Sequence, residues 1–387
     1  MTITFDLLNN ADELNACRSQ WIEFISNDVV GSNLSNHPAK ILMELELNPK
    51  RELRTLVVRE DENIVAIAPF FIEPGVFWVT LSVLKLLKFK QRKLRLFGSA
   101  FILRAHCDHA SVTESIFSYM VREVDFDVVY LHHVDCSQFL WRFINSPVLR
   151  QFGLRMTPMN NSTPTSFLIE HEGNYEAYLQ TLGKKSRQNL QRTTRKLFRE
   201  QNARVELYRD ESQVAPFLDD LDTIFKNTWQ ARTFGYKPRN DRKSLDFYQN
   251  IAREGWLRSY ILYIDDQPVA FEHVFQFGQW FEFRECGFDS DWSSYGVGSI
   301  AILLALKDIF DETDSAVTVD FGIGEAPYKK TFGNQTREIA AVNLYSMSAK
   351  AFPVILQKYL LVLERLIREL VRRFNIERFV RKLLKRQ

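Results

Sequence analysis

The amino-acid sequence predicts an α/β protein with two similar halves and a tail of amphipathic helices. Segments that alternate like β-strands are interleaved with segments of helical periodicity. The order strand, acidic turn, strand, later helix, strand occurs once in each half, which indicates an internal duplication. A chain of 387 residues also exceeds one ordinary hydrophobic core, so we expect two domains.

The first half contains five predicted elements: a strand over 54–60, a turn over 61–63, a strand over 64–72, a helix over 111–124 and a strand over 127–134. Ser111 is the expected N-cap of the helix, because Glu114 follows three residues later as in a capping box. Gly98 stands before this helix without a second glycine. The first half therefore lacks a phosphate-binding glycine loop.

The second half repeats this order and adds such a loop. Its predicted elements are strands over 257–264, 269–277 and 280–288, a helix of about four turns that begins at Gly296-Val297-Gly298, and a strand over 317–321. Two close glycines at a helix N-terminus leave backbone N–H groups unshielded, which suits a phosphate or pyrophosphate. Glycine also occurs in any tight turn. The phosphate-binding interpretation therefore depends on the order strand, Gly-x-Gly, helix, strand.

Between the halves lie helices predicted over 175–182, 184–201 and 214–229, and then a polar loop over 230–242. The helix over 184–201 is strongly basic, and Arg187 is one of its seven Lys and Arg residues. This charge is either a solvated face or a contact with a polyanion or an anionic sugar nucleotide. Because no aromatic residues are interleaved for base stacking, the pattern argues against a nucleic-acid partner.

Composition places the chain among globular proteins. Hydrophobic residues make up 45% and charged residues 25%, and no run of about 18 apolar residues predicts a membrane-spanning helix. The four cysteines are scattered, and the N-terminus lacks a signal-peptide pattern, so we expect reduced thiols in a cytoplasmic protein. From Lys350 onward there are 11 basic and 3 acidic residues, 11 − 3 = +8, so the tail is a distinct basic segment.

The residues around the glycine loop resemble the GNAT acyltransferase superfamily. Its members hold the pyrophosphate of acyl-CoA on an (Arg/Gln)-x-x-Gly-x-(Gly/Ala) loop; the glycines match here, and Ser293 replaces the Arg or Gln. The run Asp320–Lys329 is similar to a branch that unites Fem-type aminoacyltransferases with acetyltransferase-like proteins of bacterial polysaccharide operons, including cellulose synthesis. The resemblance covers most of residues 50–347.

The resemblance implies two tandem GNAT-like domains with mixed, splayed sheets. We place the first lobe at 1–172, the acyltransferase lobe at 173–347 with a helical region over 173–230, and a basic helical tail at 348–387. The implied co-substrate is acetyl-CoA or another acyl-CoA, without a metal. The implied reaction is acyl transfer to an amino or hydroxyl group of a sugar or polysaccharide precursor. Two alternatives stay open: a Fem-like aminoacyltransferase that uses aminoacyl-tRNA, and a non-catalytic partner of a polysaccharide synthase.

The resemblance also assigns roles to individual residues. The pyrophosphate loop comprises Tyr295, Gly296, Val297, Gly298 and Ser299, and backbone N–H groups at the sheet edge between the Val269 and Val317 strands face the thioester. Tyr328, just after the last core strand, is the expected acid for the thiolate. The alternative for Tyr328 is a ring packed on the sheet with a locally bonded hydroxyl.

Two residues are candidates for the general base. Strand alternation places Glu285 on the face of Phe281 and Phe283, where burial would raise its pKa toward that of a base. His273 lies on the neighbouring apolar strand, where an isolated histidine is more often structural.

We expect polar residues near the last core strand to bind the acceptor. Asp320, Glu325 and Lys329 crowd its end, either as a structural ion pair or as a site for an anionic acceptor. Arg187 on the basic helix is a further candidate for that acceptor.

Two remaining features have competing interpretations. The segments His106–His109 and His132–Cys136 hold metal-binding residue types but not the spacing of common zinc sites, so no metal is expected. The basic amphipathic tail either docks on its own protein or lies on the anionic inner face of the cell membrane as a peripheral contact.

Overall fold

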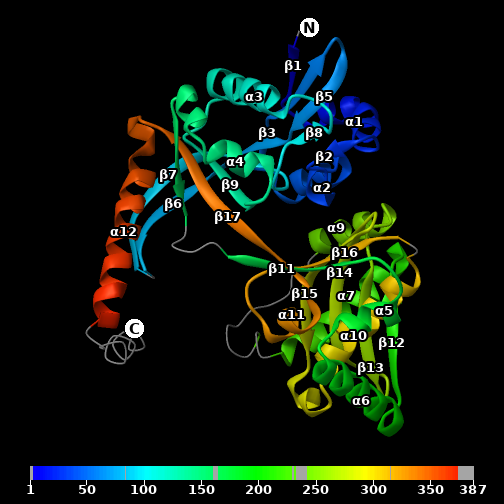
Figure 1. Cartoon of the computed structure of the whole chain (residues 1–387). Helices are drawn as coiled ribbons and strands as arrows, with labels where there is room; N and C mark the ends of the chain where they lie inside the picture. The colour runs from blue at the N-terminus through cyan, green and yellow to red at the C-terminus, as the bar shows by residue number, and fades with distance from the viewer. Residues whose placement is uncertain are drawn as a thin grey trace. The chain divides into compact units, whose positions relative to one another are not determined.

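The chain folds into two compact units, Met1–Thr163 with Glu338–Gln387 and Pro164–Arg337. The computed structural model describes residues 3–82, 84–159, 164–228, 231, 242–313 and 315–373 (Figure 1). The boundaries differ from those predicted at 172 and 347, and the tail is part of unit 1 rather than a separate segment. The reason is strand pairing: β11 (Thr165–His171) pairs with β16 of unit 2, whereas residues 339–344 of β17 pair with β9 of unit 1.

Unit 1 contains two sheets. One has the order β1 (Ile3–Leu8), β4 (Thr55–Glu60), β5 (Asn63–Ala68), β8 (Ile102–Arg104), β2 (Val29–Val30). The other has the order β3 (Glu52–Leu53), β6 (Phe70–Leu81), β7 (Leu84–Leu96), β9 (Val128–Asp135), β17 (Gln335–Ser346), and β10 (Leu154–Pro158) also pairs with β17. The described helices are α1 (Ala11–Ile25), α2 (Pro38–Leu47), α3 (His109–Glu123), α4 (Phe139–Ile144), α12 (Phe352–Arg373) and the 3₁₀ turns η1 (Leu34–Asn36), η2 (Pro147–Phe152) and η5 (Ala349–Ala351).

Helix α3 packs its apolar face on the sheets, with Ile116 and Phe117 almost fully buried. Its N-cap is Asp108, whose Oδ1 accepts hydrogen bonds from the backbone N–H groups of Ala110 and Ser111. The predicted N-cap at Ser111 was therefore wrong by one turn. An aspartate carboxylate at this position also interacts favourably with the positive end of the helix dipole.

Helix α12 docks on the long β6–β7 hairpin of its own unit. Ala351 and Val354 are buried against Phe77 and Val79. Gln357 closes the contact, because its Oε1 accepts from the Thr80 N–H at 2.7 Å and its Nε2 donates to the Thr80 carbonyl at 3.1 Å. The start of the predicted tail thus packs on the protein itself. No helix among the described residues is long and apolar enough to cross a membrane.

Unit 2 is one mixed sheet with helices on both faces. Its order is β12 (Ala203–Tyr208), β13 (Ser259–Ile264), β14 (Gln267–Phe277), β15 (Trp280–Phe288), β16 (Val317–Ile323), β11. Its helices are α5 (Tyr175–Thr181), α6 (Lys184–Glu200), α7 (Val214–Lys226), α9 (Arg242–Arg253), α10 (Val297–Asp311), α11 (Pro327–Phe332) and the 3₁₀ turns η3 (Glu211–Gln213) and η4 (Ser290–Tyr295). Helix α9 was not predicted, and the predicted loop over 230–242 lies almost wholly outside the described residues.

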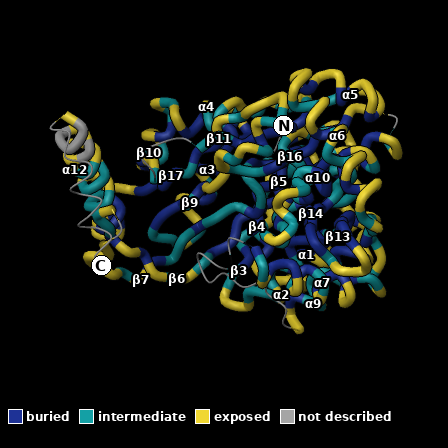
Figure 2. The backbone as a smooth tube through the Cα atoms, turned by 90° about the horizontal axis from the view of Figure 1, so that it is seen from below, coloured by how far each residue is buried: buried dark blue, intermediate teal, exposed yellow. Residues whose placement is uncertain are grey.

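Helix α10 covers one face of the unit 2 sheet and α7 covers the other. Ile302 and Leu306 of α10 pack on Val274 and Phe281, whereas Phe217 of α7 lies over His273. Figure 2 shows β13 and β14 mostly dark blue, because residues 259–264 and 269–275 are buried.

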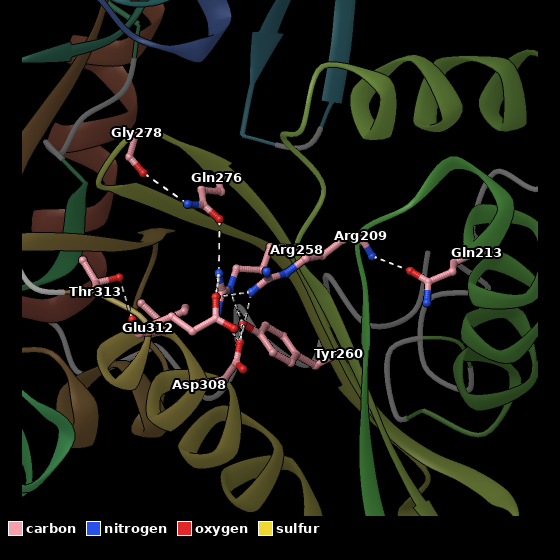
Figure 3. Close-up of polar contacts among 10 residues, drawn as sticks. Arg209, Gln213, Arg258, Tyr260, Gln276, Gly278, Asp308, Glu312 and Thr313 are labelled. Atoms are coloured by element: carbon pink, nitrogen blue, oxygen red, sulfur yellow. Dashed lines mark hydrogen bonds and ion pairs between the residues drawn. The ribbon is translucent and has the colours of Figure 1, made fainter.

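A charged cluster joins β13 to the C-terminal end of α10 (Figure 3). The guanidinium of Arg258, which is 3% exposed, contacts Asp308 and donates to Glu312 at 3.0 Å and to the Tyr260 hydroxyl at 2.6 Å. Arg209 of the neighbouring loop shares Glu312 at 2.5 Å. Every buried charge here has opposite-charge or hydrogen-bond partners, which is the condition under which a buried ion pair is tolerated.

Candidate active site

The unit 2 sheet opens between β15 and β16. These parallel strands pair only over Trp280↔Thr318, Phe281↔Val319 and Glu282↔Asp320. Beyond these residues β15 continues beside β14 as far as Phe288, and β16 continues beside β11. The two strands therefore diverge and leave a gap between their C-terminal ends. The splayed sheet was predicted, but β15 rather than the Val269 strand borders the gap.

Helix α10 begins at the end of β15 with free backbone donors. Gly296 has φ +68°, a left-handed conformation that glycine adopts without strain, and it joins η4 to α10. The first intrahelical bond runs from Ile300 N to the Gly296 carbonyl, and no side chain caps the helix. The N–H groups of Val297, Gly298 and Ser299 have no partner among the described residues, so they are available to an anion.

Gly298 is required for a different reason from the predicted one. We expected the missing side chain to let a pyrophosphate approach the backbone. In the structure, a Cβ on Gly298 would lie 2.7 Å from Cδ1 of Phe288, so glycine is needed because the helix packs closely on the last residue of β15. The close contact fixes the start of α10 at the mouth of the gap.

Basic helix α6 lies beside this loop. The Lys196 ammonium lies 5.1 Å from the ring centroid of Tyr295, and the Tyr295 hydroxyl accepts a hydrogen bond from Gln201 at 3.0 Å. The side chain of Tyr295 thus points to α6, and only its backbone leads into the glycine turn. Arg187 lies at the other end of α6, where Nη1 donates to the carbonyls of Leu179 and Gln180 at the end of α5.

A β-bulge in β15 reverses the expected side-chain alternation. His273 pairs with Glu285 and Val274 pairs with Phe283, so Arg284 is an extra residue in the strand. Phe283 therefore lies on the α10 face, whereas Glu285 lies on the opposite face beside His273. The prediction that Glu285 shares a face with Phe281 and Phe283 was wrong, because a single inserted residue shifts the period-2 pattern.

Burial nevertheless acts on Glu285 in the expected direction. Removal of the carboxyl from water raises its pKa, and the charge of Arg284 opposes this shift only in part. Glu285 is also partly exposed to solvent.

The other face of the gap holds a polar cluster around Tyr328. Its hydroxyl accepts a hydrogen bond from the Cys286 thiol at 3.5 Å, and its ring packs edge-on against Phe321. Burial raises the pKa of Tyr328 and raises the pKa of the Cys286 thiol to about 12. Both groups are therefore protonated at neutral pH. The packed ring and the locally bonded hydroxyl match the alternative to the acid role, and the acid role itself stays a prediction.

Glu272 is the residue of this cluster that sequence reasoning passed over. It is 1% exposed, pairs with Cys286 across β14 and β15, and its Oε2 has no hydrogen-bond partner among the described residues. Burial raises the pKa of Glu272 well above its usual value. The signal was present in the sequence: a carboxylate stands in the middle of the apolar run from Val269 to Phe275.

His273 is enclosed by aromatic rings on the α7 face. It is 2% exposed, and Phe217, Tyr248 and Phe275 lie 4.9–5.6 Å from its ring centroid. Burial lowers the pKa of His273 to about 3, so the imidazole is neutral across the physiological range. A base this weak and this enclosed resembles a structural histidine.

The residues predicted to hold an acceptor separate in the structure. Lys329 is buried, and its ammonium donates to the carbonyls of Gly322 at 3.0 Å and Ile323 at 2.9 Å. Asp320 accepts from the Ser166 hydroxyl at 3.0 Å, and Glu325 pairs at the surface with Lys330. Lys329 and Asp320 thus brace the end of β16, and the predicted ion pair of Lys329 with Asp320 or Glu325 is not formed among the described residues.

The histidine-rich segments of unit 1 do not gather into a ligand set. The His132 ring stacks on Tyr130 and lies 3.9 Å from His133, whereas His106 contacts Asp28. In the part of the chain that the structure describes, no three His, Cys, Asp or Glu residues are placed to hold a metal ion.

Comparison with known proteins places this part of the chain in a domain family. Residues 184–330 match the family model of the acetyltransferase (GNAT) domain. Residues 184–330 therefore form a GNAT domain. The match spans the basic helix, the glycine turn, the gap and Tyr328. No curated protein matches the chain in sequence.

Solved structures extend the likeness to the whole chain. FemX superposes with a TM-score of 0.60 over 92% of this chain and 100% of its own, at 10% identity. The C-terminal domain (DUF2156) of an Agrobacterium fabrum protein assigned as a lysylphosphatidylglycerol synthetase gives 0.51, with 89% and 96% coverage at 11% identity. A Bacteroides thetaiotaomicron protein of unknown function gives 0.51, with 88% and 99% coverage at 11% identity. The fold is accordingly that of tandem GNAT-like units.

Proposed function

We propose that this GNAT protein transfers an acyl group, acetyl in the first instance, from acyl-CoA to an amino or hydroxyl group of a sugar or polysaccharide precursor. The observation that carries the proposal is the gap between β15 and β16, which ends at the uncapped N-terminus of α10. A gap in a sheet can hold an extended chain. The three free N–H groups at its mouth can donate hydrogen bonds to a phosphate. Acyl-CoA combines these two features, because its pantetheine chain joins a pyrophosphate to a thioester.

The residues of the glycine loop would make most of the contacts with acyl-CoA. The N–H groups of Val297, Gly298 and Ser299 would hold the pyrophosphate, and the α10 dipole would favour its negative charge. Lys196, held above the Tyr295 ring, adds positive charge on the adjoining helix. The bulge at Arg284 interrupts the ladder beside the gap, which frees backbone N–H groups to polarise a thioester carbonyl.

Residues on the two faces of the gap would carry out the two proton transfers, one residue for each transfer. Glu285, with a pKa raised by burial, would take the proton of the acceptor amine or hydroxyl as its new bond to the acyl carbon forms. As the carbon–sulfur bond breaks, Tyr328 would give its proton to the leaving thiolate. Tyr328 is protonated at neutral pH, so it can donate, whereas the weakly basic His273 is a poorer acceptor than Glu285.

A second candidate is a Fem-like transfer from aminoacyl-tRNA. The fold of FemX and the basic helix α6 favour it. Lys184, Lys185 and Arg195 of α6 are exposed and make no ion pair with described residues, so they could meet phosphates. A protein that keeps the GNAT fold only to bind a polysaccharide synthase is the non-catalytic alternative.

One titration separates the candidates. Acetyl-CoA, CoA and a charged tRNA are titrated in parallel into the full chain by calorimetry. Binding of acetyl-CoA and CoA without tRNA supports the acyl-CoA proposal, and tRNA binding alone supports the Fem-like candidate. If neither CoA species binds, the leading proposal fails.

A further inference from the structure

The β6–β7 hairpin of unit 1 extends beyond the sheet to which it belongs. β3 pairs with β6 only at Phe71 and Ile72, and β9 pairs with β7 only over 93–95. From Pro74 to Leu81 the two strands pair with each other and with no other described strand. These seven steps correspond to about 23 Å of strand. An isolated two-stranded ribbon is marginally stable, so the packing of α12 on one side supports this arm.

The other side of the arm combines apolar and basic side chains. Val76 and Trp78 are 40% and 39% exposed, and they pair across the ribbon with Lys90 and Lys88. The Lys85 and Lys88 ammonium groups lie 5.3 Å and 5.7 Å from the centroid of the Trp78 ring. At the end of the arm, Leu84, Leu86 and Leu87 are 46–48% exposed.

The charge of this arm is of one sign. Residues 74–107 contain seven Lys and Arg and no Asp or Glu. Arg92 and Arg95 are paired with carboxylates at the base of the arm. Lys85, Lys88 and Lys90 make no ion pair with any residue that the structure describes. The unpaired charge is therefore concentrated where the exposed apolar side chains are.

Helix α12 carries a second exposed apolar stripe in the same unit. Tyr359, Leu363 and Leu366 lie on one helical face and are 44–66% exposed. Phe352 begins this stripe, and its ring lies 6.0 Å from Phe89 of β7. Phe89 pairs with Phe77 on the α12 side of the arm, so this stripe is separated from Trp78 by the ribbon. The outer side of the arm carries Val76, Trp78, Lys85, Lys88 and Lys90, and with the leucines at the end of the arm we call it the arm surface.

We propose that the arm surface attaches the protein to an anionic lipid bilayer, with Trp78 and the leucines at the level of the acyl chains and the three lysines at the phosphates. Tryptophan and lysine are the side chains that suit the two sides of that boundary. Lysines also protect exposed strand edges from pairing, but edge protection does not explain exposed Trp78 and three exposed leucines. Self-association through the arm would bring like charges together without carboxylates to offset them, which disfavours a second copy as the occupant.

Vesicle sedimentation with the full-length chain tests this proposal. Vesicles of phosphatidylcholine alone are compared with vesicles that contain about one third phosphatidylglycerol, at about 0.1 M and about 1 M salt. We expect binding to the anionic vesicles only, weakened by salt. The triple variant Lys85→Glu, Lys88→Glu, Lys90→Glu should lose at least about a hundredfold in affinity, because each basic residue near an anionic leaflet contributes about fivefold.

Two further variants make the outcome decisive. Lys184→Glu, Lys185→Glu, Arg195→Glu changes the charge equally on exposed positions of α6 in unit 2 and should retain binding. Trp78→Ser with Leu86→Ser keeps the lysines and should also lose binding. Equal losses in both charge variants would overturn the proposal, as would no binding of the full chain. It is also overturned if Trp78→Ser with Leu86→Ser dissociates an oligomer in analytical ultracentrifugation, because the surface then covers a second copy.

Discussion

The hydroxyl of Tyr328 lies 3.5 Å from the thiol of Cys286, although the two residues are 42 positions apart in the sequence. Tyr328 belongs to the helix after β16 and Cys286 to β15, so the contact spans the two strands that border the gap. Under the proposed function, the Tyr328 hydroxyl at this contact would protonate the leaving thiolate.

Replacement of Tyr328 by Phe should lower turnover by about 10²–10⁴, the usual contribution of a general acid. Acetyl-CoA affinity should stay nearly unchanged, since the ring and its contact with Phe321 are retained. Steady-state kinetics and calorimetry measure the two quantities. Cys286→Ala is the matched control, because it removes the partner of the hydroxyl and leaves the hydroxyl in place. Normal turnover in Tyr328→Phe would make Tyr328 a packing residue.

A carboxylate at the start of α10 should repel the donor. Ser299→Glu places a negative charge in the first turn, where it stabilises the helix, so the fold is retained. Acetyl-CoA affinity should fall about tenfold, since charge effects at a helix terminus reach about 1–2 kcal/mol. Ser299→Gln has the same shape without the charge and should bind normally. Gly298→Glu is a poorer test, because a Cβ at that position would displace Phe288. Equal affinities for the Glu and Gln variants would contradict this pyrophosphate site.

Lys329→Met should destabilise unit 2 rather than weaken acceptor binding. The ammonium donates to the carbonyls of Gly322 and Ile323, which would become unsatisfied and partly buried acceptors at a cost of about 1–3 kcal/mol. Thermal unfolding of Lys329→Met measures this loss. Lys330→Met removes an exposed ammonium one residue away and should leave the melting temperature nearly unchanged. A raised acceptor KM with an unaltered melting temperature would instead support the acceptor role.

His273 should make stability depend on pH. Its pKa is about 3 in the folded chain and near 6.5 when unfolded, so the unfolded state binds more protons between these values. The contribution of His273 to the free energy of unfolding should therefore be constant above about pH 6.5 and fall as pH decreases below it. Between pH 7 and pH 5 the loss from this residue is about 2 kcal/mol. His273→Phe should lose less stability than the parent over that interval in parallel urea titrations. An identical loss in both proteins would exclude His273 as the source.

Arg258→Met should be destabilising. It removes the buried partner of Asp308 and Glu312, but these carboxylates are 31% and 46% exposed and keep Arg209, so we expect a loss of about 1–3 kcal/mol, the range for a hydrogen bond to a charged group. Calorimetric melting measures the change. Arg253→Met removes an exposed pair with Glu211 and should melt close to the parent. A small effect of Arg258→Met would show that water replaces the guanidinium.

Local patterns in the sequence determined the order of elements and the position of the glycine turn. The helix that begins after Gly296, the strand over 317–321 and the placement of Tyr328 beyond it depend on short-range periodicity and turn chemistry. These features sufficed to predict a GNAT domain, because they are contiguous in sequence.

Only the tertiary structure decided which polar side chains share the gap. The bulge at Arg284 moved Glu285 to the face of His273, and one inserted residue of this kind leaves no periodic signal. Buried Glu272 lies opposite Cys286 because β14 pairs with β15. The Lys329 ammonium donates to a backbone carbonyl instead of pairing with the neighbouring carboxylates. The domain boundaries likewise followed from the partners of β11 and β17. Such long-range pairings depend on which surfaces exclude water together, and the sequence encodes them across the whole chain rather than at any one motif.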